Sequence, residues 1–281
     1  MVENRKMSQS KMKAAIQSEI QALMDRVMNR VLVEDPFIPE KHWAAKPLYA
    51  ALVPDEVFKG SHFERRFVTP FGHAWENLAL IAAKYGFGYG SREYMLTGTV
   101  KDGRLRRISE VLNQLEHQTK GEERRRPDWN IELAYILEGK GEEIPVSVIC
   151  DIYAESKQTG ERVAFELKGP LPNSDQTKVS KEKLLKLYAM TFPQVAHAYF
   201  ALPYNPYGKK ENYDWSFPNR WFNMRQDESV LIGNEFWEKV GGLGTYQAFL
   251  DAVNEISAEY KVRIYREYLG IEPPVHFDRN L

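Results

Sequence analysis

The stretch that decides the fold is residues 146–168, which read VSVICDIYAE, then SKQTGE, then RVAFELK. Its first part alternates and is rich in Val, Ile and Tyr, which predicts a strand, and its last part predicts a second strand. Gly160 suits a hairpin turn between them. Side chains two apart in a strand share one face of a sheet, so Glu166 and Lys168 point the same way. The hairpin therefore places Asp151 on one strand near Glu166 and Lys168 on the other.

Two carboxylates and an ammonium gathered in this way predict a metal site. Neighbouring carboxylates repel each other, so at neutral pH at least one should titrate abnormally or bind a cation. Hard oxygen ligands suit Mg²⁺, which keeps several waters and completes its shell with a substrate phosphate. We expect Asp151 and Glu166 to hold Mg²⁺ and Lys168 to assist the attacking water in hydrolysis of a phosphodiester. The alternative is an exposed hairpin with an ordinary Glu/Lys pair. The order strand, turn, strand, helix favours a metal-dependent nuclease over this alternative.

The order Asp, hairpin, Glu-x-Lys resembles the PD-(D/E)xK nuclease superfamily, although here Cys150 and not Pro precedes the Asp. Residues 171–188 read LPNSDQTKVSKEKLLKLY. This string is similar to the segment after Glu-x-Lys in type II restriction endonucleases of the TdeIII family, where Pro-Asn-x-Asp-Gln-Thr-Lys leads into a helix. The match is dense over residues 151–188, and the order of elements is compatible elsewhere.

The resemblance implies an α/β fold with a mixed central β-sheet flanked by helices and with helical additions at both ends. It implies a type II restriction endonuclease that acts as a homodimer on double-stranded DNA. Mg²⁺-dependent cleavage would leave 5′-phosphate and 3′-hydroxyl ends, and a cognate DNA methyltransferase is expected in the same system, not as a stable subunit. Two alternatives stay open: a repair or recombination nuclease that selects DNA structure, and a catalytically silent DNA-binding protein. The intact Asp, Glu and Lys argue against the second.

Composition sets the outer limits. The 281 residues are 43% hydrophobic and 27% charged, which is ordinary for a globular protein. The formal net charge is −1, so a nucleic acid would have to be held by a local basic surface. Cys150 is the only cysteine, which excludes disulfides and cysteine-based zinc sites within one chain. The sequence has no long apolar run and no signal-peptide pattern, so we expect a cytoplasmic protein. The resemblance to restriction endonucleases implies that this cytoplasm is prokaryotic.

Two helices are expected in the first third of the chain. Residues 11–33 carry apolar side chains at three- and four-residue spacing, which predicts an amphipathic helix that ends at Asp35-Pro36. Residues 69–85 predict a second helix, with Thr69 as N-cap, Pro70 at the first helical position and a glycine-rich turn at residues 86–90. Glu76 lies in this otherwise apolar helix. The superfamily resemblance implies that Glu76 is an auxiliary metal-site acid, and a helix-surface glutamate is the alternative.

The segments around the hairpin complete the expected sheet. Residues 91–127 are strongly charged, with a helix around residues 108–118, and residues 131–137 predict a strand or a short helix. Pro127-Asp128 is a literal Pro-Asp pair, but it lies far upstream of Glu166, so Asp151 is the better metal ligand. After the lysine-rich helix, residues 196–202 predict a strand, which gives the order strand, strand, helix, strand of a mixed sheet.

DNA contacts are expected from the lysine-rich helix and from the long irregular segment of residues 203–225. In the helix, Lys178, Lys183 and Lys186 fall on one broad face that could follow a phosphate backbone, and a solvated face is the alternative. In the segment, Asn and Arg side chains can read base edges. The candidate DNA-binding residues are Asp175, Gln176, Lys178, Lys181, Asn219, Arg220, Asn223 and Arg225.

No repeat or linker divides the chain, so we predict a single nuclease domain over residues 1–281. Within it, residues 1–34 contain the N-terminal helix, residues 69–203 the catalytic core, and residues 204–281 the recognition loop and C-terminal helices.

Overall fold

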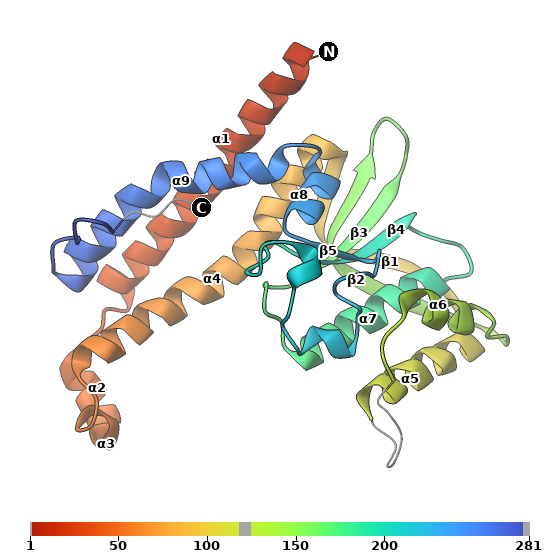
Figure 1. Ribbon diagram of the computed structural model, residues 1–281, viewed down its shortest axis with the longest axis horizontal. Coiled ribbons are helices and arrows are strands. Elements are labelled where there is room, and N and C mark those ends of the chain that lie inside the picture. The colour runs from red at the N-terminus through yellow and green to blue at the C-terminus, as the bar shows by residue number, and fades with distance from the viewer. Residues whose placement is uncertain (1, 118–124, 278–281) are drawn as a thin grey trace. The chain divides into compact units, whose positions relative to one another are not determined.

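The computed structural model describes residues 2–117 and 125–277 (Figure 1). The chain divides into two compact units. One, here called the helical unit, comprises Met1–Leu78 and Gln247–Leu281, and the other, the sheet unit, comprises Ala79–Tyr246. The expectation of one nuclease domain, with the subdivisions given above, stays a prediction.

The sheet unit is built on five strands in the order β1-β2-β3-β4-β5 (Figure 1). The strands are β1 (Gly88–Lys101), β2 (Glu143–Ser156), β3 (Arg162–Leu167), β4 (His197–Leu202) and β5 (Val230–Ile232). The first three strands pair antiparallel and the last three pair parallel. The predicted α/β fold with a mixed central sheet is therefore confirmed. So is the hairpin: Ile152 pairs with Phe165, and Gly160 has the positive φ of 72° that its turn requires.

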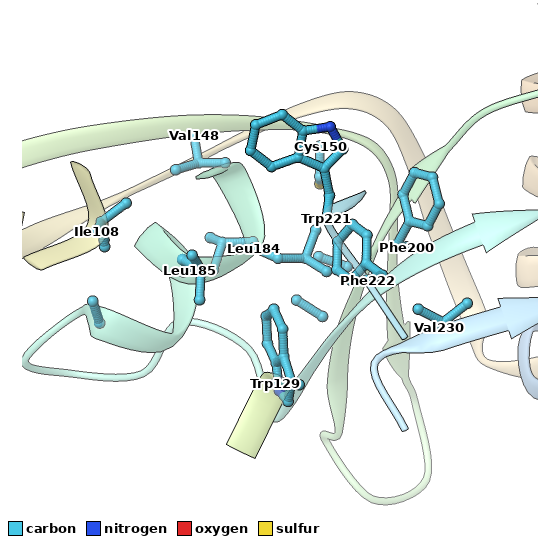
Figure 2. Close-up of a cluster of buried hydrophobic side chains, with 14 of the residues drawn as sticks. Ile108, Trp129, Val148, Cys150, Leu184, Leu185, Phe200, Trp221, Phe222 and Val230 are labelled. Atoms are coloured by element: carbon cyan, nitrogen blue, oxygen red, sulfur yellow. The ribbon is translucent and has the colours of Figure 1, made fainter. Parts of the chain in front are cut away.

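Three helices pack on one face of this sheet, namely α5 (Asp102–Glu116), α6 (Trp129–Leu137) and α7 (Ser174–Ala189). Figure 2 shows the core between these helices and the sheet, where Leu184 and Leu185 of α7 approach Val148 and Cys150 of β2. Phe200 of β4 stacks on a second aromatic ring, Phe222, at a centroid distance of 4.8 Å. The segment between β4 and β5 adds Trp221 and Phe222 to this core and includes the short 3₁₀ helices η2 (Lys210–Asn212) and η3 (Pro218–Arg220). Each fully buried ring of this kind contributes roughly 1.5–3 kcal/mol.

The opposite face of the sheet is covered in part by α8 (Asn234–Gly241), which follows β5. Phe236 of α8 meets Phe165 of β3 edge-on at 5.8 Å between ring centroids. Phe165 and Leu167 are buried on either side of Glu166 in sequence, so strand alternation turns Glu166 to the face that α7 covers. This alternation decides which helix can contact the candidate metal ligand.

The sequence did not predict β1. We expected a turn at residues 86–90 and a charged segment after it, but Gly88 begins a strand of 14 residues. Two glycines explain how the strand fits: a Cβ at Gly90 would lie 3.0 Å from that of Ala83, and one at Gly98 would lie 2.9 Å from the sulfur of Met190. Glycine is disfavoured in strands on average, and close tertiary packing overrides that preference here.

The pairing of β1 with β2 is distorted beside Asp151. The register joins Arg92 to Ile152 and Tyr94 to Cys150, so Glu93 lies opposite Asp151. Glu93 has a φ of 48°, in the left-handed region that favours glycine. A non-glycine residue held there costs on the order of 1–3 kcal/mol, and such strain tends to collect at functional sites.

Substitutions at Glu93 are expected to reverse the usual strand preference. In an ordinary strand Val stabilises more than Gly, but at a positive φ the branched side chain clashes with the backbone. We expect the free energy of unfolding of the Glu93→Gly variant to be about 2 kcal/mol larger than that of Glu93→Val, so the Gly variant is the more stable one. Urea denaturation of the two variants measures this difference. A Val variant as stable as the Gly variant contradicts the strained conformation.

The helical unit contains α1 (Val2–Asn29), α2 (Pro39–Ala45), α3 (Pro47–Ala50), the part of α4 (Asp55–Gly86) up to Leu78, and most of α9 (Thr245–Arg263). A π-helical turn, η1 (Arg30–Glu34), extends α1 to Glu34, and a second, η4 (Ile264–Leu269), follows α9. The predicted helix of residues 11–33 is thus confirmed. Its core packs Leu23 and Val27 against Ala74 of α4. In the described part of the chain, no helix combines the length and apolarity needed to span a membrane.

The predicted start of the second helix was wrong. Thr69 and Pro70 lie inside α4, which begins already at Asp55. Proline in a helix interior removes one backbone hydrogen bond, at a cost of about 3 kcal/mol. A row of aromatic contacts runs along the helix at the same place: Phe63 with Phe67, Phe67 with Phe71, and Phe71 with Trp75. This packing holds the helix together through the proline.

Candidate active site

The hairpin brings its three predicted residues together. The Nζ atom of Lys168 lies 3.0 Å from Oδ2 of Asp151 and 2.8 Å from Oε1 of Glu166. One ammonium touches both carboxylates, so these point to the same side of the sheet and lie close to each other. The backbone N–H of Leu167 also donates to Oδ2 of Asp151 at 2.7 Å, which fixes that side chain to the end of β3. This geometry is the one that the hairpin pattern predicted.

Helix α7 completes the cluster from the other side. Lys183 donates to Oε1 and Oε2 of Glu166 at 2.9 and 2.8 Å. The hydroxyl oxygen of Ser180 lies 3.3 Å from Oε1, but its O–H has a closer acceptor in the carbonyl oxygen of Gln176 at 2.9 Å. Asn173 caps the start of this helix, because its side chain accepts a hydrogen bond from the backbone N–H of Gln176. The sequence pattern does not place Ser180 or Lys183 in the metal site, and it predicts Lys183 only as one of the lysines that could follow a phosphate backbone. The available signal was their spacing of three residues, which puts both on one helical face.

The electrostatics of the cluster keep Lys168 charged. Burial lowers the pKa of its ammonium, but the negative charges of Glu166 and Asp151 outweigh this effect, so the pKa is raised above its ordinary value. Lys168 is therefore a cationic donor at neutral pH. Burial also raises the pKa of the neighbouring Cys150 thiol to about 12, so this side chain packs in the core as a neutral group.

The donor set fits Mg²⁺. Asp151 and Glu166 supply carboxylate oxygens, the ligands that Mg²⁺ prefers, and one or two carboxylates suffice when waters and a substrate phosphate fill the remaining positions. Across residues 2–117 and 125–277, no three His, Cys, Asp or Glu side chains gather into a larger metal-binding group. A closed cage of the kind that holds structural zinc or calcium is therefore not formed by these residues.

Residues 12–257 match the family described as type II restriction endonuclease, HinfI. The chain belongs to this HinfI family. It is a site-specific endodeoxyribonuclease. These matches confirm neither the resemblance to the TdeIII family nor the one to the PD-(D/E)xK superfamily.

Individual proteins similar to this chain are also type II restriction enzymes. The type II restriction enzyme HgiEI of Herpetosiphon aurantiacus is 24% identical over 270 residues, which cover 90% of this chain and 93% of the relative. HgiCII from the same organism is 26% identical over 230 residues, covering 80% of this chain and 82% of the relative. The similarity to these enzymes extends well beyond the hairpin.

One predicted DNA contact of this HinfI-family chain was wrong. Lys181 is fully buried, and its Nζ lies 2.5 Å from Oε2 of the equally buried Glu132. The same ammonium donates to the carbonyl oxygen of Trp221. Asp227, 8% exposed, carries a further negative charge beside it. A buried ammonium does not reach a DNA phosphate, so Lys181 belongs to the core and leaves the DNA-binding set.

The other candidate DNA contacts occupy varied positions. Asp175 and Gln176 are exposed at the start of α7, and Lys178 pairs with Glu116. In the segment after β4, Arg225 is exposed and pairs with Asp214, whereas Asn219, Arg220 and Asn223 are half-buried. Lys186 pairs with Glu182 on its own helix. The expected basic stripe of α7 is thus formed by lysines that already have acidic partners.

Asp128 and Glu76 are the two further acidic residues that the sequence offers near a metal site. Asp128 of the literal Pro-Asp pair caps α6 by accepting from the backbone N–H of Ile131 at 3.0 Å, which accounts for it structurally. Glu76 belongs to the helical unit, whereas Asp151 and Glu166 belong to the sheet unit. Its membership of the metal site stays a prediction.

Asp227 gives the stability of this restriction endonuclease a pH dependence. Burial raises the pKa of Asp227 to about 6, and the charge of Glu132 adds to the effect. A carboxyl whose folded pKa exceeds its unfolded value favours the folded state while protonated, and that contribution is lost as the pH rises through the folded pKa. Between about pH 4 and pH 6 the wild type should therefore lose roughly 2–3 kcal/mol relative to Asp227→Asn. Urea unfolding at several pH values measures this, and parallel pH profiles contradict it.

Proposed function

We propose that this chain is a Mg²⁺-dependent restriction endonuclease with the PD-(D/E)xK arrangement, which hydrolyses one phosphodiester in each strand of a duplex site and leaves 5′-phosphate and 3′-hydroxyl ends. The observation that carries the proposal is the contact of one lysine, Lys168, with two carboxylates from neighbouring strands. Membership of the HinfI family supplies the substrate class, because type II restriction endonucleases act on DNA.

Asp151 and Glu166 are the residues that would hold Mg²⁺. When bound, the cation supplies Lewis-acid stabilisation of phosphate charge and a more acidic water. Protonated Lys168 would donate toward the non-bridging oxygens of the scissile phosphate or toward the attacking water, which would stabilise the negative charge that builds up there. The N–H of Leu167 keeps Asp151 in place while this happens. Glu76 remains our candidate for an auxiliary acid.

DNA binding is assigned to the remaining candidates. Asp175, Gln176 and Lys178 lie in the first turns of the helix that carries Lys183, so they can position the backbone near the cluster. Asn219, Arg220, Asn223 and Arg225 are proposed to read base edges. A homodimer would match the two-fold symmetry of a palindromic site. We also propose that a cognate methyltransferase protects the host DNA in a prokaryotic cytoplasm.

Plasmid cleavage tests the proposal. Purified protein incubated with several plasmids and Mg²⁺ should produce discrete fragments, and excess EDTA should prevent cleavage. The fragments should religate without prior phosphorylation, since ligation requires 5′-phosphate and 3′-hydroxyl ends. A smear contradicts sequence-specific cleavage. Fragments that form equally in EDTA contradict the metal dependence, and fragments that religate only after phosphorylation contradict the end chemistry.

A further inference from the structure

The candidate site is electrically balanced before any cation binds. Asp151 and Glu166 carry two negative charges, and Lys168 and Lys183 carry two positive charges within hydrogen-bonding distance of them. Lys168 belongs to the Glu-x-Lys pattern. Lys183 comes from a different element, and nothing in that pattern accounts for its position. The extra ammonium therefore requires its own explanation.

Lys183 occupies both oxygens of Glu166. Its Nζ lies 2.9 Å from Oε1 and 2.8 Å from Oε2, and Glu166 itself is only 3% exposed. The side chain of Lys183 is 29% exposed, so it retains a route to solvent. A cation that binds Glu166 needs at least one of these oxygens. Either the ammonium moves away or two positive groups share one carboxylate, and both outcomes oppose cation binding.

We propose that Lys183 is a positioning residue that sets the divalent-cation affinity of this site by competing for the carboxylate of Glu166; the inference rests on the proposed function of Asp151 and Glu166 as metal ligands. With Lys183 in place the free protein binds the cation weakly, because the four side chains offer no excess negative charge. A DNA phosphate adds the missing negative charge and attracts the displaced ammonium. Cation and DNA binding then favour each other.

The structure favours this role over a purely structural one. An ion pair that only stabilises α7 has a ready comparison in Lys186, which pairs with Glu182 on the same helix and is similarly exposed at 32%. Lys183 instead reaches from the helix to the strand and contacts both oxygens of a buried carboxylate. Replacing Lys183 should therefore change cation binding, and replacing Lys186 should not.

Mn²⁺ binding in the absence of DNA tests the proposal. The free Mn²⁺ signal in electron paramagnetic resonance gives the affinity of the full chain, and Mn²⁺ prefers the same oxygen ligands as Mg²⁺. Lys183→Gln is expected to bind Mn²⁺ about tenfold more tightly than the wild type, since it keeps a polar group but removes the competing charge. Lys183→Arg keeps the charge and should bind as the wild type does. Lys186→Gln is the matched control and should also be unchanged.

The outcomes separate the inference from the proposed function. Equal Mn²⁺ affinity of wild type and Lys183→Gln, including no measurable binding by either, overturns the inference. A similar gain from Lys186→Gln also overturns it, because the effect would then reflect net charge alone. Asp151→Asn is expected to lower the Mn²⁺ affinity in both the wild-type and Lys183→Gln backgrounds. If only that loss fails to occur, the metal-ligand assignment under the proposed function fails instead.

Discussion

Asp151→Asn is expected to slow DNA cleavage by about a thousandfold or more while DNA affinity stays within a few-fold of the wild type. The substitution removes the negative charge but preserves the shape of the side chain. Its amide oxygen can still accept the hydrogen bond that the backbone N–H of Leu167 donates to Oδ2 at 2.7 Å. The loss therefore falls on the chemistry and not on the fold. Initial rates on plasmid DNA with Mg²⁺ and gel-shift titrations in EDTA measure the two quantities separately.

Asp128→Asn is the matched control, because Asp128 follows a proline in the literal Pro-Asp pair. Asp128 accepts a hydrogen bond from Ile131 as the N-cap of α6, and asparagine caps helices about as well as aspartate. This variant should keep both its fold and its cleavage rate. If Asp128→Asn instead abolished cleavage while Asp151→Asn remained active, Asp128 and not Asp151 would be the metal ligand.

The hairpin site was predictable because its geometry is local. Alternation fixes the faces of Glu166 and Lys168, and the turn at Gly160 brings Asp151 back beside them. The cap of α7 by Asn173 is local in the same way, since a cap uses residues within one turn of each other.

The parts that sequence missed depend on distant partners. Lys181 and Lys183 are two residues apart and of one type, yet one is buried against Glu132 of α6 and the other bonds Glu166 of β3. Neither acidic partner lies within one helical turn of its lysine, so helical periodicity alone does not predict which partner each lysine has. Strand β1 was not predicted because its glycines and charged residues have low strand propensity. Close packing, not strand propensity, decides the structure at these positions. Pro70 gave a false helix start because aromatic contacts along α4 compensate for its missing hydrogen bond.

Lys181→Met is expected to reduce the free energy of unfolding by about 3–5 kcal/mol, the usual cost of leaving a buried charge without its partner. Lys181 and Glu132 are both fully buried, with 2.5 Å between Nζ and Oε2. The ammonium also lies 5.0 Å from the ring centroid of Phe222 and donates to the carbonyl oxygen of Trp221. Its removal leaves the buried carboxylates of Glu132 and Asp227, whose charges repel each other, without that cation. Chemical denaturation monitored by tryptophan fluorescence measures the loss.

The double variant Lys181→Met with Glu132→Leu should recover most of this stability, because a buried ion pair replaced by apolar groups of similar volume is often neutral. Lys186→Met, which breaks a partly exposed pair on the same helix, should cost less than about 1 kcal/mol. A double variant no more stable than Lys181→Met would mean that the ammonium acts through packing and its bond to Trp221, not through charge. Since Trp221 and Phe222 anchor the segment that carries Arg220 and Asn223, the destabilised single variant should also bind DNA more weakly than the double variant does.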